Sequence, residues 1–209
     1  HYPDEEREEG RPLRQAPCYD RLKELGAVFG QKFGWERANW FAPSKELQKD
    51  DWSFRRSNWF EHVGNECKNV SENAGLLDMS AFAKCRISGP GAEEFLDNLV
   101  ANKIPKKNGR VNLCHALNTA GGVHSEFTIA KEKENSFYLV SAGAFQRLDH
   151  DWIHKWMPKD GSVSYENLTN SMGVLVLAGP KSRDILSKIT RTDLSNENFP
   201  WLSSKKINV

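Results

Sequence analysis

The chain has no long hydrophobic run and almost no excess of charge. No apolar stretch approaches the roughly 20 residues that a membrane-spanning helix requires, so a membrane partner is not expected. The 209 residues carry 29 Lys and Arg against 28 Asp and Glu, which leaves a formal net charge of +1. A balance this even provides no electrostatic reason to expect nucleic acid or an anionic lipid surface as a partner.

Cysteine is scarce, and no two cysteines form a C-x-x-C pair. The four are Cys18, Cys67, Cys85 and Cys114. Neither a metal site nor a disulfide framework is therefore expected, and reduced thiols are the default. His150 and His154 have a spacing that could hold a metal ion on a helix, but no third ligand lies near them in sequence, so a surface or packing role is favoured. The opening segment HYPDEEREEG is acidic, unlike a signal or transit peptide, although a processed or internal start stays open.

What the chain does contain, from residue 59 onward, is a succession of helix and strand patterns. The expected amphipathic helices are 59–73, 92–101, 144–156 and 181–189. The expected strands are 76–79, 83–88, 110–117, 123–130, 137–141, 163–168, 172–177 and 205–209. Because the strands both alternate with helices and follow one another directly, the pattern predicts an α+β fold with mixed or antiparallel sheets and packed helices. The last strand pattern runs to the end of the chain, so we expect an incomplete domain.

The helical spacing gives each expected helix an apolar side, formed in helix 92–101 by Phe95, Leu96 and Leu99. In helix 59–73 it consists of Phe60, Val63, Cys67 and Val70. In helix 144–156 it consists of Phe145, Leu148, Trp152 and Trp156. The segments ISGPGAEEFLDNL and LAGPKSRDILSKI also resemble each other, because each reads as a strand, a Gly-Pro turn and an amphipathic helix. They predict two similar strand–turn–helix units within one fold.

Residues 1–57 are expected to form an extended, aromatic-rich connector, and residues 58–209 a separate domain. A short helix over 19–25 is predicted to follow Pro17 and to end at Gly26. Glycines and a proline then interrupt a run that contains Phe29, Phe33, Trp35, Trp40 and Phe41. So many aromatic residues argue against disorder. They either cover a neighbouring domain or fold back onto residues 58–209, and composition does not decide between these alternatives.

The stretch NTAGGVHSEFTIAKEKENSFYLVSAG, residues 118–143, is the most informative part of the chain. It predicts two strands behind a Gly121–Gly122 turn, where glycine permits a tight bend or a close approach to a ligand. Glu126 lies just beyond that turn. It is either an exposed strand carboxylate, the common case for acidic residues, or a carboxylate held in a cleft to meet a basic nitrogen of a ligand. The stretch alone does not decide.

Longer segments resemble a known family. GRPLRQAPCYDRLKELGAVFGQKFGWERANWFAP resembles the connector that follows the flavin domain in dimethylglycine and sarcosine dehydrogenases and in the related regulatory subunit of pyruvate dehydrogenase phosphatase. The segments that follow resemble the N-terminal part of the folate-binding domain shared with the aminomethyltransferase (T-protein) of the glycine cleavage system. They are GLLDMSAFAKCRISGPGAEEFLDNL, GRVNLCHALNTAGGVHSEFTI, FYLVSAG and VLVLAGPKSRDILSKIT.

The resemblance implies a tetrahydrofolate-binding, one-carbon-transfer portion of a flavin-dependent N-methyl amine dehydrogenase that forms 5,10-methylenetetrahydrofolate. The implied partners are folate, a small methylated amine and the flavin domain of the same polypeptide. FAD would belong to the full-length protein only, because this chain has no GxGxxG fingerprint, and the isolated segment is expected to be inactive. The implied location is the cytoplasm of a bacterium or the mitochondrial matrix of a eukaryote.

The resemblance also implies the site residues. Glu126 ends the segment GGVHSE, at the position of the catalytic carboxylate in the family's GGxxxD pattern. Glutamate keeps the charge of aspartate but adds one methylene, which alters the reach of a group that must lie within hydrogen-bond distance of its proton. The implied folate-lining residues are Phe82, Val111, Tyr138 and Val140, with Val111 the looser match. Phe82 and Tyr138 would supply flat apolar walls, and ordinary core packing is the alternative for each of the four. No residue is expected to bind a metal.

A second function stays open within the same family. The chain could be a regulatory or interaction module that keeps the fold without the chemistry, like the phosphatase regulatory subunit, whose branch the segments WMPKDGS and ENFPWL resemble. A free-standing demethylase or aminomethyltransferase is disfavoured, because such an enzyme has no flavin domain for the connector to follow.

Overall fold

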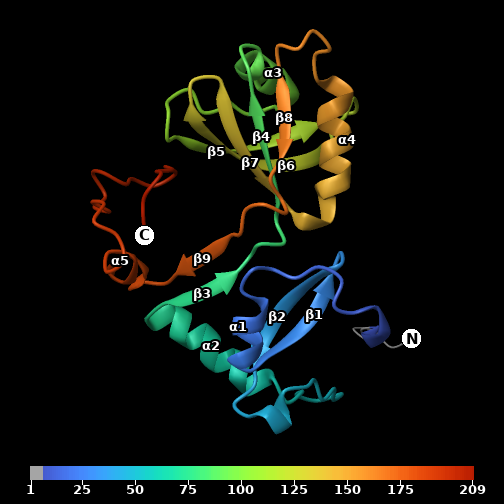
Figure 1. The fold of residues 1–209 in the computed structure, drawn as a ribbon, viewed down its shortest axis with the longest axis vertical. Helices are drawn as coiled ribbons and strands as arrows, with labels where there is room; N and C mark the ends of the chain where they lie inside the picture. The colour runs from blue at the N-terminus through green and yellow to red at the C-terminus, as the bar shows by residue number, and fades with distance from the viewer. Residues whose placement is uncertain (1–6) are drawn as a thin grey trace. The chain divides into compact units, whose positions relative to one another are not determined.

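The computed structural model describes residues 7–209 as two compact units (Figure 1). The first unit comprises the chain up to Ala81 together with Gly173–Leu186. The second comprises Phe82–Met172 and Ser187–Val209. Residues 1–6, which belong to the acidic opening segment, lie outside the described residues.

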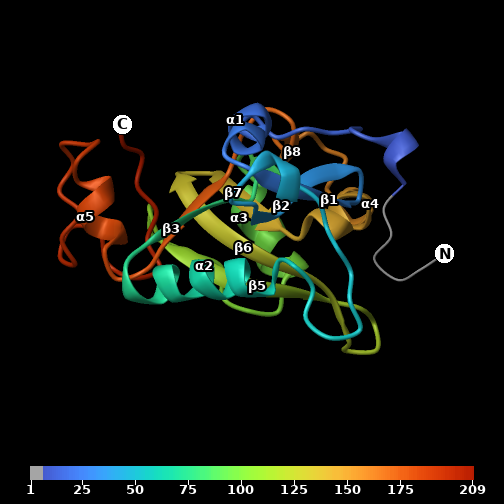
Figure 2. The same ribbon diagram turned by 90° about the horizontal axis from the view of Figure 1, so that it is seen from below.

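The first unit is built from an antiparallel hairpin, a helix and a second two-stranded ribbon. Its elements are η1 (Glu8–Gly10), α1 (Tyr19–Glu24), β1 (Ala27–Lys32), β2 (Trp35–Phe41), η2 (Lys45–Leu47), α2 (Phe60–Glu72), β3 (Gly75–Asp78), β9 (Leu175–Ala178) and α5 (Ser182–Leu186). β1 pairs with β2, and β3 pairs with β9, both antiparallel. Figure 2 shows α2 as one straight helix that follows the loop after η2.

The aromatic run at 27–41, expected as part of an extended connector, forms the antiparallel hairpin of β1 and β2. Trp35 and Trp40 are buried on the β1–β2 hairpin, and Trp40 clusters with Val28 and with Val63 of α2. The indole Nε1 of Trp40 donates a hydrogen bond of 2.8 Å to Asp50 Oδ1. The hairpin therefore supplies the surface that these aromatic rings need. A division of the chain at 57/58 remains a prediction.

The apolar side predicted for α2 is only partly covered. Val63 packs against the Trp40 cluster, whereas Phe60 and Cys67 are exposed, and no residue of α2 is fully buried. The predicted strand at 205–209 is not formed. Ser204 N, just before these residues, donates to the carbonyl of Gly109 at 2.7 Å, but no ladder of paired residues continues from there. A strand needs such a ladder to satisfy its backbone groups.

The second unit is a five-stranded sheet with helices on one face. Its elements are β4 (Ala83–Ser88), α3 (Ala92–Leu99), β5 (Val111–Leu117), β6 (Val123–Lys133), β7 (Ser136–Ser141), η3 (Gly143–Phe145), α4 (Gln146–Trp156) and β8 (Ser164–Asn167). The strand order is β5-β6-β7-β4-β8, and every neighbouring pair is antiparallel. This arrangement confirms the predicted α+β class, and of the mixed or antiparallel sheets expected it is the antiparallel kind that forms.

Alternation along the strands places one core on a single face of that sheet. Every second side chain of β4, β5, β6 and β7 points toward α3 and α4, as the strand period of two requires. These residues are Cys85 and Ile87 of β4, Cys114 and Ala116 of β5, Phe127 and Ile129 of β6, and Phe137 and Leu139 of β7. Phe95, Leu96 and Leu99 of α3 and Ile153 of α4 complete the core.

The two similar strand–turn–helix segments have the same local conformation at their turns. Gly89 and Gly179, the glycines of the two Gly-Pro turns, have φ values of 118° and 111°. Added Cβ atoms would lie 2.3 Å from the carbonyl oxygen of Ser162 and 2.5 Å from that of Val70, respectively. Both positions require glycine, because a side chain is disfavoured at such φ and has no room. The predicted repeat is thus a repeat of turn geometry.

Candidate functional site

A tight turn over residues 118–122 directly precedes β6, the strand that carries Glu126. The side-chain Oδ1 of Asn118 accepts hydrogen bonds from the backbone N–H groups of Ala120 and Gly122, at 3.0 and 2.9 Å. Gly121 N donates to the carbonyl of Asn118 at 3.0 Å. This arrangement is an Asx-type turn, in which a short polar side chain satisfies the backbone donors of a bend. It fixes where β6 begins, and with it the register of the residues that follow.

Glu126 lies on the face of the sheet opposite the helices. Its neighbours Ser125 and Phe127 are buried at 3% and 1% exposure on the core side. Strand alternation therefore directs Glu126 the other way, and its side chain is 61% exposed. We refer to this side of the five-stranded sheet as the open face. The carboxylate is accessible to a ligand there.

Glu126 has a direct partner on the adjacent strand. His115 of β5 stands opposite Glu126 in the β5–β6 register. Its Nε2 lies 2.9 Å from Glu126 Oε2, and its side chain is 37% exposed. No family motif or local pattern singled out His115 in the sequence. The signal that could have found it is its position on β5, which a correct register places across from Glu126.

Tyr138, Val140 and Val111 share the open face with Glu126. Phe137 and Leu139 point to the core, so Tyr138 and Val140 point away from it, and both are half-buried. Val111 of β5 is also half-buried, and its register partner Ala130 is in turn the partner of Tyr138.

Phe82 immediately precedes β4 and is half-buried. Lys84 and Arg86, two and four residues later, are the register partners of Val140 and Tyr138. The fold thus brings Val111, Glu126, Tyr138 and Val140 to one face of one sheet, and Phe82 lies in the bend directly before β4.

Charge on the open face is organised around Arg86. Its guanidinium pairs with Glu132 at 2.7 Å and with Glu166 at 2.6 Å. The hydrogen bond from Arg86 lowers the pKa of the Glu132 carboxyl below its usual value. Burial raises the pKa of the Tyr138 phenol, and the nearby Glu132 charge adds to the effect. Tyr138 therefore stays neutral and presents an aromatic ring with a hydroxyl donor at physiological pH.

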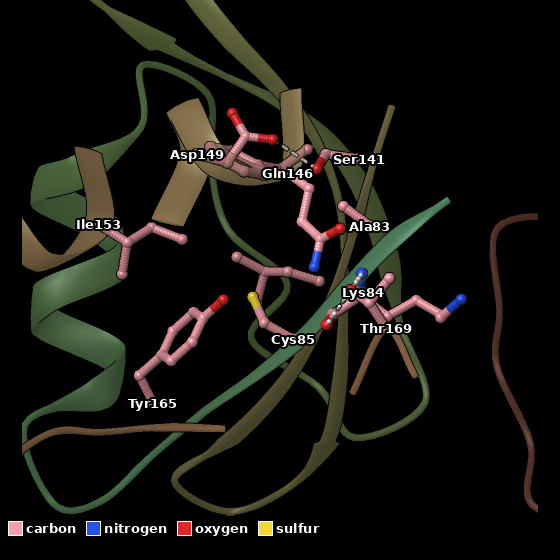
Figure 3. A pocket seen from close by; sticks show the side chains of 11 residues that line it. Ala83, Lys84, Cys85, Ser141, Gln146, Asp149, Ile153, Tyr165 and Thr169 are labelled. Carbon is pink, nitrogen blue, oxygen red and sulfur yellow. Dashed lines mark hydrogen bonds between the residues drawn. The ribbon is translucent and has the colours of Figure 1, made fainter. Parts of the chain in front are cut away.

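A small cavity lies on the other side of the sheet, against α4 (Figure 3). Its lining includes Cys85, Gln146, Asp149 and Tyr165. Its volume is about 10 Å³, on the order of one water molecule. Glu126 does not line it. This cavity is too small for a folate or any other organic ligand, so it belongs to the packing of the core.

Asp149 is a buried carboxylate that the sequence did not single out. It is 4% exposed, and its two carboxylate oxygens accept hydrogen bonds from Ser125 Oγ at 2.6 Å and Ser141 Oγ at 2.5 Å (Figure 3 shows the second). Burial, with a further contribution from Asp149, raises the pKa of the Cys85 thiol to about 12. The side of α4 that faces the sheet therefore carries the Asp149 carboxylate and is not the predicted apolar side.

The orientation predicted for α4 is accordingly wrong. Asp149 and Ile153 are its buried residues, while Phe145, Leu148 and Trp156 are exposed. The fourth member of the predicted stripe, Trp152, is partly buried and stacks on His124 with ring centroids 3.9 Å apart. Ser125 and Ser141 offset part of the free-energy cost of burying this carboxylate, because each donates a hydrogen bond to one of its oxygens.

Histidine geometry favours packing over metal binding at the spacing noted in the sequence. The rings of His150 and His154 stack with centroids 3.9 Å apart, and His154 Nδ1 lies 2.8 Å from the carbonyl of His150. Within residues 7–209, no three His, Cys, Asp or Glu side chains are grouped so that they could hold a metal ion. None of the helices in that same range is long and apolar enough to cross a bilayer.

Comparison with known proteins agrees with this architecture. Residues 18–209 match the family described as "GCVT N-terminal domain". The whole chain aligns with mitochondrial dimethylglycine dehydrogenase at 39% identity, in mouse and in human, and covers 24% of each of those proteins. The mouse mitochondrial pyruvate dehydrogenase phosphatase regulatory subunit is 34% identical over 96% of this chain and 23% of its own length. The chain thus spans about a quarter of the curated relatives it matches.

Among solved structures, the crystal structure of the glycine cleavage system aminomethyltransferase T from Bartonella henselae superimposes with a TM-score of 0.70. The match covers 85% of this chain and 44% of that one, at 22% sequence identity. At this level of identity the likeness concerns the fold alone. It confirms that the predicted α+β architecture is of the aminomethyltransferase type.

Proposed function

Because the chain belongs to the GCVT N-terminal domain family, we propose that it is part of the tetrahydrofolate-binding, one-carbon-transfer portion of a flavin-dependent N-methyl amine dehydrogenase. A flavin domain of the same polypeptide, which holds FAD, oxidises the methyl group of a small amine such as dimethylglycine or sarcosine. The oxidised carbon then passes to folate to form 5,10-methylenetetrahydrofolate, with release of the demethylated amine if it arrives as an iminium or of water if it arrives as formaldehyde. The 39% identity to dimethylglycine dehydrogenases supports this proposal.

The observation that carries the proposal is the gathering of four of the predicted residues on one open face. Glu126 supplies a carboxylate there, and Val140 and, further along the sheet, Tyr138 and Val111 supply aliphatic and aromatic surface, while Phe82 lies in the bend before β4. A reduced pteridine is flat, apolar on its faces and rich in nitrogen at its edges. Aromatic walls with one well-placed acceptor are the usual means of binding such a ring.

In this proposal Glu126 acts on the folate nitrogens that accept the one-carbon unit. An ionised carboxylate accepts hydrogen bonds only, so it orients an N–H group of folate toward itself. As the nitrogen bonds to carbon it must lose its proton, and a carboxylate within hydrogen-bond reach can take that proton. Tyr138, which stays neutral, packs its ring against the ligand and does not compete for the proton.

The test uses the full-length protein with Glu126→Ala. Methylenetetrahydrofolate formation should fall by about 100-fold, in the range of lost general acid–base catalysis, while reduction of the flavin by the amine continues at its normal rate. Glu134→Ala, which removes an exposed carboxylate from the turn between β6 and β7, is the matched control and should change neither rate. Folate-coupled turnover that is unchanged by Glu126→Ala contradicts the role given to this residue.

The second candidate function is a regulatory or interaction module without folate chemistry. The 34% identity to the pyruvate dehydrogenase phosphatase regulatory subunit favours it, as does the high exposure of Glu126. Titration of tetrahydrofolate into the full-length protein discriminates between the two, because this chain has seven tryptophans whose fluorescence reports binding. Quenching with a thermal shift supports the enzyme, and the absence of both supports the module.

The proposed location depends on whether the protein is eukaryotic or bacterial. The dimethylglycine dehydrogenases named above are mitochondrial proteins. A eukaryotic version of this protein would act in the mitochondrial matrix and a bacterial one in the cytoplasm. Fractionation of the source cells, followed by immunoblotting, distinguishes these compartments.

A further inference from the structure

His115 is the side chain that contacts Glu126 on the open face, and we propose that it is a positioning residue for folate-dependent carbon transfer. It holds the Glu126 carboxylate in the orientation that the folate nitrogens require. This inference rests on the proposed function. It assigns to His115 an action through Glu126, and no contact with the reacting atoms.

The backbone at His115 is held rigidly. Its neighbours along β5, Cys114 and Ala116, are fully buried in the core. β5 is one of the two edge strands of the sheet, and a residue beyond α3 contacts it here: Ala101 N donates a hydrogen bond of 2.8 Å to the carbonyl of His115. Anchored residues on both sides leave the imidazole little freedom except rotation about its own side-chain bonds.

The backbone at Glu126 is held in the same way. Ser125 is tied to the buried Asp149 of α4 by its 2.6 Å hydrogen bond, and Phe127 is packed in the core. His115 and Glu126 are directly opposite in the antiparallel register. Side chains at such positions start about 5 Å apart at Cβ, so contact between them follows from the backbone.

A glutamate in this position needs such a restraint. Its carboxylate is separated from the backbone by three rotatable bonds, and at 61% exposure little packing limits their rotation. Ordering a flexible side chain on binding costs free energy that would otherwise favour the complex. A donor at Glu126 Oε2 removes part of that cost before the ligand arrives, and it leaves Oε1 to accept from folate.

The surroundings of His115 on β5 are apolar. Leu113 and Leu117 are two residues before and after it and share its face of the strand. Histidine is therefore the residue that supplies a polar group to Glu126 from this part of β5. Because a single contact joins one imidazole nitrogen to one carboxylate oxygen, the pair is suitable for a double-mutant cycle.

The experiment compares His115→Leu and His115→Gln in the full-length protein. Leucine removes the donor, whereas glutamine carries an amide N–H at a similar reach to Nε2. We expect His115→Leu to lower folate-dependent kcat/KM and tetrahydrofolate affinity by about tenfold, the size of one lost hydrogen bond to a charged group. His115→Gln should recover most of the loss. His150→Gln on the exposed side of α4 is the matched control and should behave as the unsubstituted protein.

The same measurements in a Glu126→Ala background separate positioning from a structural role. If His115 acts through Glu126, His115→Leu has no further effect on tetrahydrofolate affinity once Glu126 is absent. An equal loss in both backgrounds, or no loss in either, overturns the inference although the proposed function stands. Failure of the unsubstituted protein to bind tetrahydrofolate overturns the proposed function and the role of His115 together.

Discussion

Ser125 of β6 and Asp149 of α4 are joined by a 2.6 Å hydrogen bond inside the core. This contact ties the helix to the strand at the residue next to Glu126. With Ser141 on β7, it also satisfies a carboxylate that is almost completely buried. The pair therefore links the stability of the sheet to the placement of the candidate site on its other face.

Replacing Asp149 should destabilise the second unit. Asp149→Ala leaves two buried hydroxyl groups without their acceptor and opens space beside a water-sized cavity, at a cost of about 2–3 kcal/mol. Hydrogen exchange of peptides from α4 and β6 measures this loss locally. Asp151→Ala, an exposed carboxylate on the same helix, is the control. Unchanged protection of both segments would show that the two serine hydrogen bonds add nothing to stability.

The Cys85 thiol should be unreactive in the native protein. Burial and the adjacent Asp149 raise its pKa to about 12 from an ordinary value of 9.0, so little thiolate exists at pH 8. Iodoacetamide at that pH should label the exposed Cys67 and spare Cys85, as read by peptide mass spectrometry. Labelling of Cys85 at a rate similar to Cys67 would contradict the buried environment described here.

The same shift gives a pH dependence of stability. The folded-state pKa of Cys85 is raised, so the unfolded chain releases this proton at lower pH than the folded chain does. The contribution of the thiol is fully present below about pH 9 and is lost as the pH rises toward 12. Thermal unfolding of Cys85→Ala should show less loss of stability across this alkaline range than the unsubstituted protein.

Two glycine-to-alanine substitutions should change the free energy of unfolding in opposite directions. Gly64 lies within α2, where an added Cβ meets nothing within 4 Å, so Gly64→Ala should stabilise the helix by about 0.5–1 kcal/mol. Gly89→Ala places a methyl group against the carbonyl of Ser162 at a φ that disfavours it, and should destabilise by about 2 kcal/mol or more. Thermal unfolding of both variants is the measurement, and shifts of the same sign would contradict the turn geometry.

Tyr138 should contribute to folate binding through its ring. Under the proposed function, Tyr138→Ala removes a half-buried aromatic wall and should weaken tetrahydrofolate binding by about tenfold or more. Tyr138→Phe keeps the wall and should bind within about twofold of the unsubstituted protein. Tryptophan fluorescence titration measures both. Equal weakening by the two substitutions would assign the contact to the hydroxyl group instead.

Local pattern was sufficient to predict most elements of the second unit. The period-two runs around Phe127 and Phe137 and the helical spacing around Phe95 are properties of short segments, and each formed the expected element. The α4 helix shows where local pattern failed. Its predicted apolar side carries more aromatic residues than the side that is buried. Asp149 nevertheless faces the sheet, because Ser125 and Ser141 donate hydrogen bonds to it from β6 and β7, and Ile153 packs in the core beside it.

The sequence by itself determined the family and the α+β class with mixed or antiparallel sheets, because motifs and periodicity are written in contiguous residues, and it supplied the prediction of Glu126 through the GGVHSE motif. Only the tertiary structure decided that Trp35 and Trp40 are buried on a hairpin, which side of α4 is buried, and that His115 stands against Glu126. These outcomes depend on which strand pairs with which and in what register. Such pairing is set by the packing of the whole unit, and no short segment contains it.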